Sequence, residues 1–166
     1  MSTSTEAIRD ILKKALRVEL DGYTFYSMTA DRSTKPTVQR LFAKLARDEA
    51  EHQTYLKAIM KRYEDLGVGG FFVDPRDPGM AEYSSQLFTD AFRQEAEGEM
   101  FEVGVLSIGL QLEANAVAFF SGASREATDP QVSGFYRFLS DWEDHHYRTL
   151  KQLYDSVRAD FESKPA

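Results

Sequence analysis

The segments EAEH at residues 49–52 and EDHH at residues 143–146 decide how this chain folds. They lie 94 residues apart, and each follows another glutamate by 30 residues, Glu19 in the first case and Glu113 in the second. Two of the three histidines in the chain end these segments. The sequence therefore carries the pattern Glu, gap, Glu-x-x-His twice.

The two halves of the chain also match outside this pattern. Helix-stop signals, prolines and apolar residues recur at the same offset, which indicates an internal duplication of a helical hairpin. The matched pairs are Leu12 and Leu106, Leu16 and Leu110, Phe25 and Phe119, Thr34 and Thr128, Pro36 and Pro130, and Leu56 and Leu150.

Apolar residues at helical spacing predict an all-α protein. The segments 33–36 and 128–130 each look like a helix stop followed by a capped restart with proline in the first turn. Between the hairpins, 84–94 is a candidate short helix. We expect one domain over residues 1–166, an antiparallel four-helix bundle with a helical hairpin at 4–66, a long crossover at 67–98 and a second hairpin at 99–161.

The spacing also predicts where the acidic residues lie. Glu19 and Glu49 are about equally far from the first turn, so an antiparallel hairpin places them at one level along its axis. The same holds for Glu113 and Glu143 around the second turn. Two such hairpins bring four carboxylates into one layer, on apolar stripes where an unpaired charge costs several kcal/mol.

Two divalent cations would neutralise four carboxylates, and two neutral imidazoles would add no charge. In a helix, Glu-x-x-His presents both side chains on one face. Oxygen-rich ligation with some nitrogen favours iron or manganese, and the absence of thiolate disfavours structural zinc. One such motif is more often a pair of solvated residues, but two copies at matched spacing favour a dimetal site.

The chain resembles the ferritin-like superfamily and, within it, rubrerythrin-like proteins. The resemblance rests on Glu19-x6-Tyr26, Glu49-x-x-His52, Glu113-x6-Phe120 and Glu143-x-x-His146. It implies a di-iron centre that reacts with peroxide or dioxygen. Implied roles are terminal ligation by Glu19 and Glu113, bridging by Glu49 and Glu143, and nitrogen ligation by His52 and His146.

Two departures from that family stand out. The chain has no cysteine and no rubredoxin domain, so an external, rubredoxin-like protein is expected to donate electrons. Rubrerythrins tend to carry a further glutamate three residues after the third-helix ligand, where this chain has Ala116. The resemblance therefore does not extend to a redox-linked ligand exchange through that glutamate, and the remaining set is closer to the six ligands of bacterioferritins.

Other residues near the motifs have two interpretations each. Tyr26 lies on the face of Glu19 and is a candidate to hydrogen-bond a ligand, or an ordinary core aromatic. Asp48 is a candidate to orient a ligand imidazole, or an exposed residue, and its counterpart is Trp142. His145 points away from the site. An acidic run lies at the start of the third long helix and has two interpretations: a solvated helix start, or a path that guides iron inward. It consists of Glu95, Glu97, Glu99 and Glu102.

The leading hypothesis for function is a di-iron oxidoreductase that reduces hydrogen peroxide or oxidises ferrous iron. The alternatives are a ferritin-like storage multimer, a dimanganese catalase and a non-catalytic metal-binding interaction module. A net charge of −7 without a basic face argues against nucleic-acid binding. We expect a cytoplasmic protein without a membrane span, because no signal-peptide-like start and no run of about 18 apolar residues is visible. We also expect a homodimer.

Overall fold

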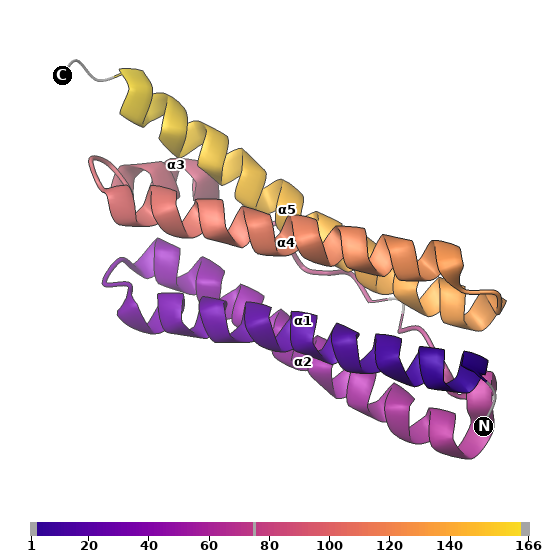
Figure 1. The fold of residues 1–166 in the computed structure, drawn as a ribbon. Helices are drawn as coiled ribbons and strands as arrows, with labels where there is room; N and C mark the ends of the chain where they lie inside the picture. Colours follow the sequence, from indigo (N-terminus) through magenta and orange to yellow (C-terminus); the bar gives the residue numbers. More distant parts are fainter. Residues whose placement is uncertain (1–2, 75, 164–166) are drawn as a thin grey trace.

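The computed structural model describes residues 3–74 and 76–163, and it confirms the all-α prediction. Helices α1 and α2 form one antiparallel hairpin, and α4 and α5 form the other (Figure 1). The crossover between them holds a short 3-10 helix, η1, and one further helix, α3. The bounds are α1 Thr3–Arg32, α2 Pro36–Leu66, η1 Gly67–Gly70, α3 Gln86–Glu95, α4 Met100–Glu126 and α5 Pro130–Ser163.

The crossover runs back along the bundle, so that α4 starts at the same end as α2 and runs parallel to it (Figure 1). Gly67 ends α2 with a φ of 62°, a conformation that favours glycine. The chain then follows α2 and α5. The Tyr55 ring meets Phe72 edge to face, and the Ser84 and Thr149 hydroxyls lie 2.9 Å apart. This side of the bundle is therefore covered by the crossover.

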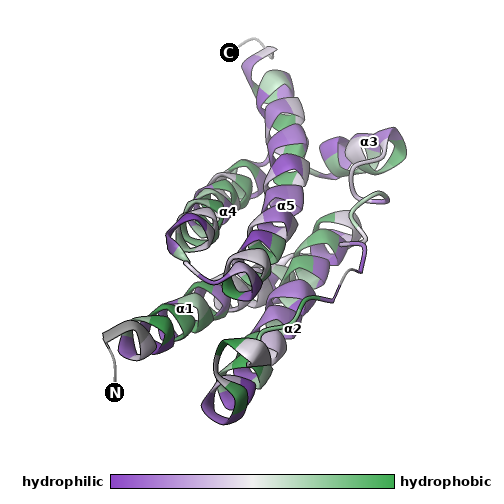
Figure 2. Cartoon of the chain, turned by 90° about the vertical axis from the view of Figure 1, so that its right-hand side faces the viewer, coloured by the Kyte–Doolittle hydropathy of each residue, from purple (hydrophilic) through white to green (hydrophobic). Residues whose placement is uncertain are grey.

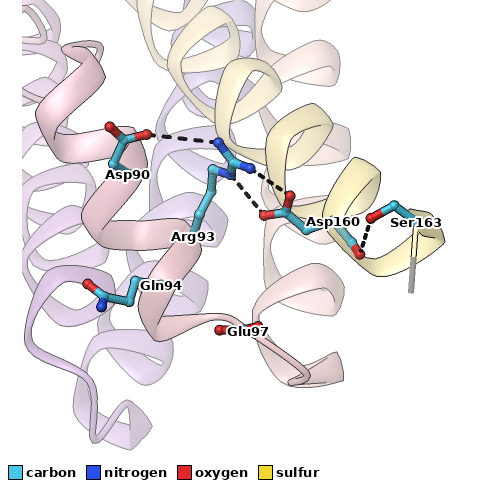
Figure 3. A pocket seen from close by; sticks show the side chains of 6 residues that line it. All are labelled: Asp90, Arg93, Gln94, Glu97, Asp160 and Ser163. Atoms are coloured by element: carbon cyan, nitrogen blue, oxygen red, sulfur yellow. Dashed lines mark hydrogen bonds and ion pairs between the residues drawn. The ribbon is translucent and has the colours of Figure 1, made fainter. Parts of the chain in front are cut away.

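Helix α3 is fixed to the end of α5 by an ion pair. The Arg93 guanidinium donates two hydrogen bonds to the Asp160 carboxylate, at 2.8 and 2.6 Å (Figure 3). Ser85 caps the start of α3, because its side chain accepts from the Phe88 N–H at 3.1 Å. Helix α3 is thus capped at its start and joined to α5 near its end.

The two predicted capped restarts differ in the structure. In the second, Asp129 Oδ1 accepts from the N–H groups of Gln131 at 2.8 Å and Val132 at 3.3 Å. In the first, α1 ends at Arg32 and Pro36 begins α2 as predicted, but Lys35 occupies the cap position and makes no side-chain cap, so the predicted local cap is wrong. The cap comes instead from the crossover, where the Glu95 carboxylate accepts from the Thr37 N–H at 2.9 Å.

The acidic run at the start of α4 also differs from a solvated helix start. Glu102 is 3% exposed, and Lys35 Nζ lies 3.2 Å from its Oε1. Together with the Glu95 cap, this ion pair joins the end of the crossover and the start of α4 to the turn between α1 and α2. The solvated interpretation is therefore wrong for Glu95 and Glu102, which have structural partners.

The apolar core consists of two clusters along the bundle axis, and the carboxylate layer lies between them. One cluster is centred on Leu41, Leu45 and Leu106, and the other on Leu12, Leu56 and Phe120. The duplicated pairs agree in burial: Leu12 and Leu106 are buried, and so are Leu56 and Leu150. The repeat in the sequence is therefore a repeat in packing.

Helix α4 differs from the others in its outer surface. Between Val103 and Ser124 its only charged residue is Glu113, which is buried. Figure 2 shows α4 largely in hydrophobic or neutral colours, whereas α5 is mostly hydrophilic on the side facing the viewer. By length and composition alone α4 could cross a membrane, a test that core helices of helical bundles also pass.

Replacing Glu95 with alanine removes the acceptor for the Thr37 N–H. We expect the free energy of unfolding, measured by urea denaturation, to fall by about 1 kcal/mol. Gln94→Ala is the control, because Gln94 is an exposed neighbour in the same helix, and it should change stability by less than about 0.5 kcal/mol. Equal losses in the two variants would contradict a capping role for Glu95.

Candidate dimetal site

The structure brings all six residues of the duplicated pattern together at the centre of the bundle. Each of the four long helices contributes, and none of the six side chains has a residue exposure above 3%. They form two groups whose ligand atoms lie within 4.8 Å of one another, and both groups contain Glu49 and Glu143. The first group is completed by Glu19 and His52, the second by Glu113 and His146.

Both imidazoles turn Nδ1 toward the carboxylates. His52 Nδ1 lies 2.8 Å from Glu143 Oε1 and 3.3 Å from Glu19 Oε2. His146 Nδ1 lies 3.3 Å from Glu113 Oε1 and 3.3 Å from Glu143 Oε2. Each ring therefore offers one nitrogen to the space between the acids of its group.

Several atoms that face this space are buried without a hydrogen-bond partner among residues 3–74 and 76–163. They are Glu19 Oε1, Glu113 Oε2, Glu143 Oε2 and His146 Nδ1. Orphaned donors and acceptors in a dry site cost about 1–3 kcal/mol each. Oxygen and imidazole nitrogen are ligands for iron and manganese, so the donor set fits two such ions.

Burial and mutual repulsion shift the ionisation of the cluster. Burial, reinforced by the charge of Glu143, raises the pKa of Glu19, Glu49 and Glu113 well above the usual value. Glu143 behaves in the opposite way: burial disfavours its charge, but the two imidazoles lower its pKa. Without metal, the layer therefore favours proton uptake by Glu19, Glu49 and Glu113.

The imidazoles favour their charged forms. Burial opposes protonation of His52 and His146, but the attraction of Glu143 for the first and Glu113 for the second outweighs it and raises both pKa values. A metal ion at Nδ1 would displace that proton. Metal binding to this cluster should therefore release protons to solvent.

Tyr26 contacts the cluster directly. Its hydroxyl donates to Glu113 Oε1 at 2.7 Å, and its side chain is fully buried. Burial and the Glu113 charge raise the pKa of Tyr26 well above 10, which keeps the phenol protonated as a donor. The corresponding residue of the other half, Phe120, has no hydroxyl.

Asp48 is buried and not exposed. Its Oδ2 lies 2.9 Å from His146 Nε2, on the side of the ring away from the carboxylates. Lys44 Nζ donates to both Asp48 oxygens, at 2.6 and 2.7 Å. Burial opposes the charge, but the bonds from His146 and Lys44 lower the pKa of Asp48. Sequence reasoning missed Lys44, although its i,i+4 spacing from Asp48 was visible.

A small opening leads to the cluster between α1 and α4, on the side opposite the crossover. Its volume is about 10 Å³, close to the space of one water molecule. Val18, Gly22, Leu112 and Ala116 border it, and Glu49, Glu113 and Glu143 lie at its inner end. Gly22, three residues after Glu19, was also missed: a Cβ there would lie 3.3 Å from the Glu49 side chain.

His145 lies outside the cluster. It is exposed on α5 and lines a surface recess with residues of the crossover. This position agrees with the prediction that His145 points away from the site.

The metal-free protein should lose stability as pH rises above about 6.5. The histidine pKa values are raised in the folded state, so their contribution is complete below about pH 6.5 and disappears as pH passes through the raised values. The raised acids act in the same direction, whereas Glu143 contributes stability that is lost only in acid. Thermal denaturation between about pH 6 and 9, with chelator present, measures this loss.

The same scan with Co²⁺ should slope the other way, because metal binding requires deprotonated ligands. Glu19→Gln is the diagnostic variant, since a neutral isostere should make the metal-free protein less sensitive to pH. Parallel curves with and without Co²⁺ would contradict the cluster as the source of the pH dependence.

Comparison with known proteins agrees with this geometry. The model of the Rubrerythrin family matches residues 10–154, a range that includes all six cluster residues. No solved structure matched the chain. The two adjacent groups fit a dimetal site of the kind found in that family. The chain belongs to the Rubrerythrin family.

Proposed function

We propose that this protein is a di-iron oxidoreductase that reduces hydrogen peroxide. Glu19 and Glu113 would each bind one ion, Glu49 and Glu143 would bridge the pair, and His52 and His146 would supply nitrogen. The observation that carries the proposal is the sharing of Glu49 and Glu143 by two buried four-residue groups. Two groups with common carboxylates fit ions close enough to act on one small molecule.

Two ferrous ions at this site would supply one electron each, and with two protons these reduce one hydrogen peroxide to two waters. The side chains hold this centre in a dry, anionic layer. Tyr26 holds Glu113 through its hydroxyl, and Asp48 holds His146. We propose that a rubredoxin-like protein supplies the electrons for turnover.

The size and lining of the opening between α1 and α4 favour a small, uncharged oxidant. Its border is apolar and narrow, formed by Val18, Leu112 and the small residues Gly22 and Ala116. A neutral molecule the size of hydrogen peroxide needs little rearrangement to pass, whereas a bulky organic peroxide would require the helices to separate.

Oxidation of ferrous iron as the substrate is the second candidate. The observation that favours it is the buried set of four glutamates and two histidines without a further glutamate three residues after Glu113, where this chain has Ala116. The same ligand types also suit manganese, so a dimanganese catalase is a further alternative. Elemental analysis after anaerobic purification separates the metals, and light scattering tests for a hollow storage multimer.

Anaerobic titration should give two irons per chain. Stopped-flow mixing of the diferrous protein with hydrogen peroxide should then produce a ferric absorbance faster than mixing with dioxygen. Glu49→Ala should reduce iron binding below one ion per chain, because Glu49 belongs to both groups. Glu51→Ala, two residues along on the same helix, is the control and should keep two irons. A protein that binds no iron would contradict the di-iron proposal.

Ala116→Val should narrow the opening. We expect oxidation by hydrogen peroxide to slow about tenfold, a barrier increase of about 1.4 kcal/mol, while the iron content stays at two. Ala118→Val is the matched control, because Ala118 is exposed on the same helix. If both variants react at the wild-type rate, the oxidant does not pass between α1 and α4.

A further inference from the structure

The outward nitrogens of the two imidazoles have different surroundings. His146 Nε2 is 2.9 Å from the Asp48 carboxylate, which is itself fixed by Lys44. Lys44 also donates to the Pro78 carbonyl of the crossover at 2.9 Å. The His146 ring is therefore held by a chain of contacts that reaches the surface layer of the bundle.

His52 Nε2 has no such support. It is buried and has no hydrogen-bond partner within the described ranges, 3–74 and 76–163. The Trp142 ring stands edge to face against the imidazole, with centroids 5.2 Å apart and planes at 83°. An indole N–H is a donor only, so Trp142 cannot accept a proton from His52.

This difference comes from the duplicated sequence. Asp48 and Trp142 occupy the same place in the two halves, each directly before the Glu-x-x-His glutamate. A second difference falls on the same side: the Tyr26 hydroxyl fixes Glu113, whereas Phe120 has no hydroxyl to offer Glu19. Both supporting contacts therefore belong to the group of His146 and Glu113.

The ligands themselves are the same in kind and number in the two groups, so they do not offset the difference in supporting contacts. Each group has one glutamate of its own and one histidine, and both share Glu49 and Glu143. A carboxylate behind a ligand histidine fixes the ring and raises its basicity, and losing such a partner typically lowers metal affinity 10- to 100-fold.

We propose that the two metal positions are unequal: the position of His146 and Glu113 holds its ion about 10- to 100-fold more tightly than the position of His52 and Glu19, which exchanges its ion. This inference rests on the proposed dimetal site. It assigns Asp48 as a positioning residue that acts through His146, and it makes one ion resident and the other replaceable.

Anaerobic titration of the whole chain with Co²⁺, followed by visible absorption and calorimetry, tests the proposal. The wild-type protein should bind two ions in two resolved steps. His52→Gln should keep the tight step, and His146→Gln should keep the weak one. Asp48→Asn should bring the two affinities together by weakening the first step, and the ligand-field spectrum of the first ion should change.

Asp141→Asn is the matched control, because it removes the same charge from an exposed position next to Trp142. It should leave both steps as in the wild type, and thermal denaturation of the metal-free variants reports whether each one folds. Two equal affinities in the wild type, or an unchanged ratio in Asp48→Asn, would overturn the inequality and leave the dimetal site intact. Binding of fewer than two ions by the wild type would contradict the dimetal site itself.

Discussion

Four buried carboxylates in one layer are the constraint on which this structure depends. The layer lies between two apolar clusters, so the carboxylates cannot reach solvent unless the packing on both sides is disrupted. In such surroundings the acids need positive charge close by, because desolvation and mutual repulsion otherwise oppose ionisation. The histidines, one from each Glu-x-x-His segment, turn toward them for the same reason.

Duplication made much of this fold predictable. The repeat placed Glu19, Glu49, Glu113 and Glu143 at one level, and helical periodicity placed the helix ends within a few residues of those observed. These features depend on local spacing. The cap from Glu95 and the pair between Lys35 and Glu102 do not, because they join segments 58 and 67 positions apart. Only the path of the crossover brings those residues together.

The two halves of the site differ at the positions where the sequence repeat is broken. Asp48 faces His146 where Trp142 faces His52, and the Tyr26 hydroxyl bonds to Glu113, whereas Phe120 has no hydroxyl. The crossover adds a third asymmetry, because it covers the α2 and α5 side and leaves the opening between α1 and α4. Sequence comparison of the halves exposes the first two differences. It does not show which face of the bundle stays open.

The ionisation of the cluster connects folding to metal loading. Burial raises the pKa of Glu19, Glu49 and Glu113, whereas the two imidazoles lower the pKa of Glu143. Proton uptake by the cluster therefore favours the metal-free fold at lower pH, and metal binding competes with those protons. The two apolar clusters hold the helices that carry the carboxylates and histidines, so an incoming ion meets a site of fixed geometry. Its binding displaces protons from the ligands. The affinity of the site then rises with pH over the range in which the metal-free fold weakens, because the same protons control both.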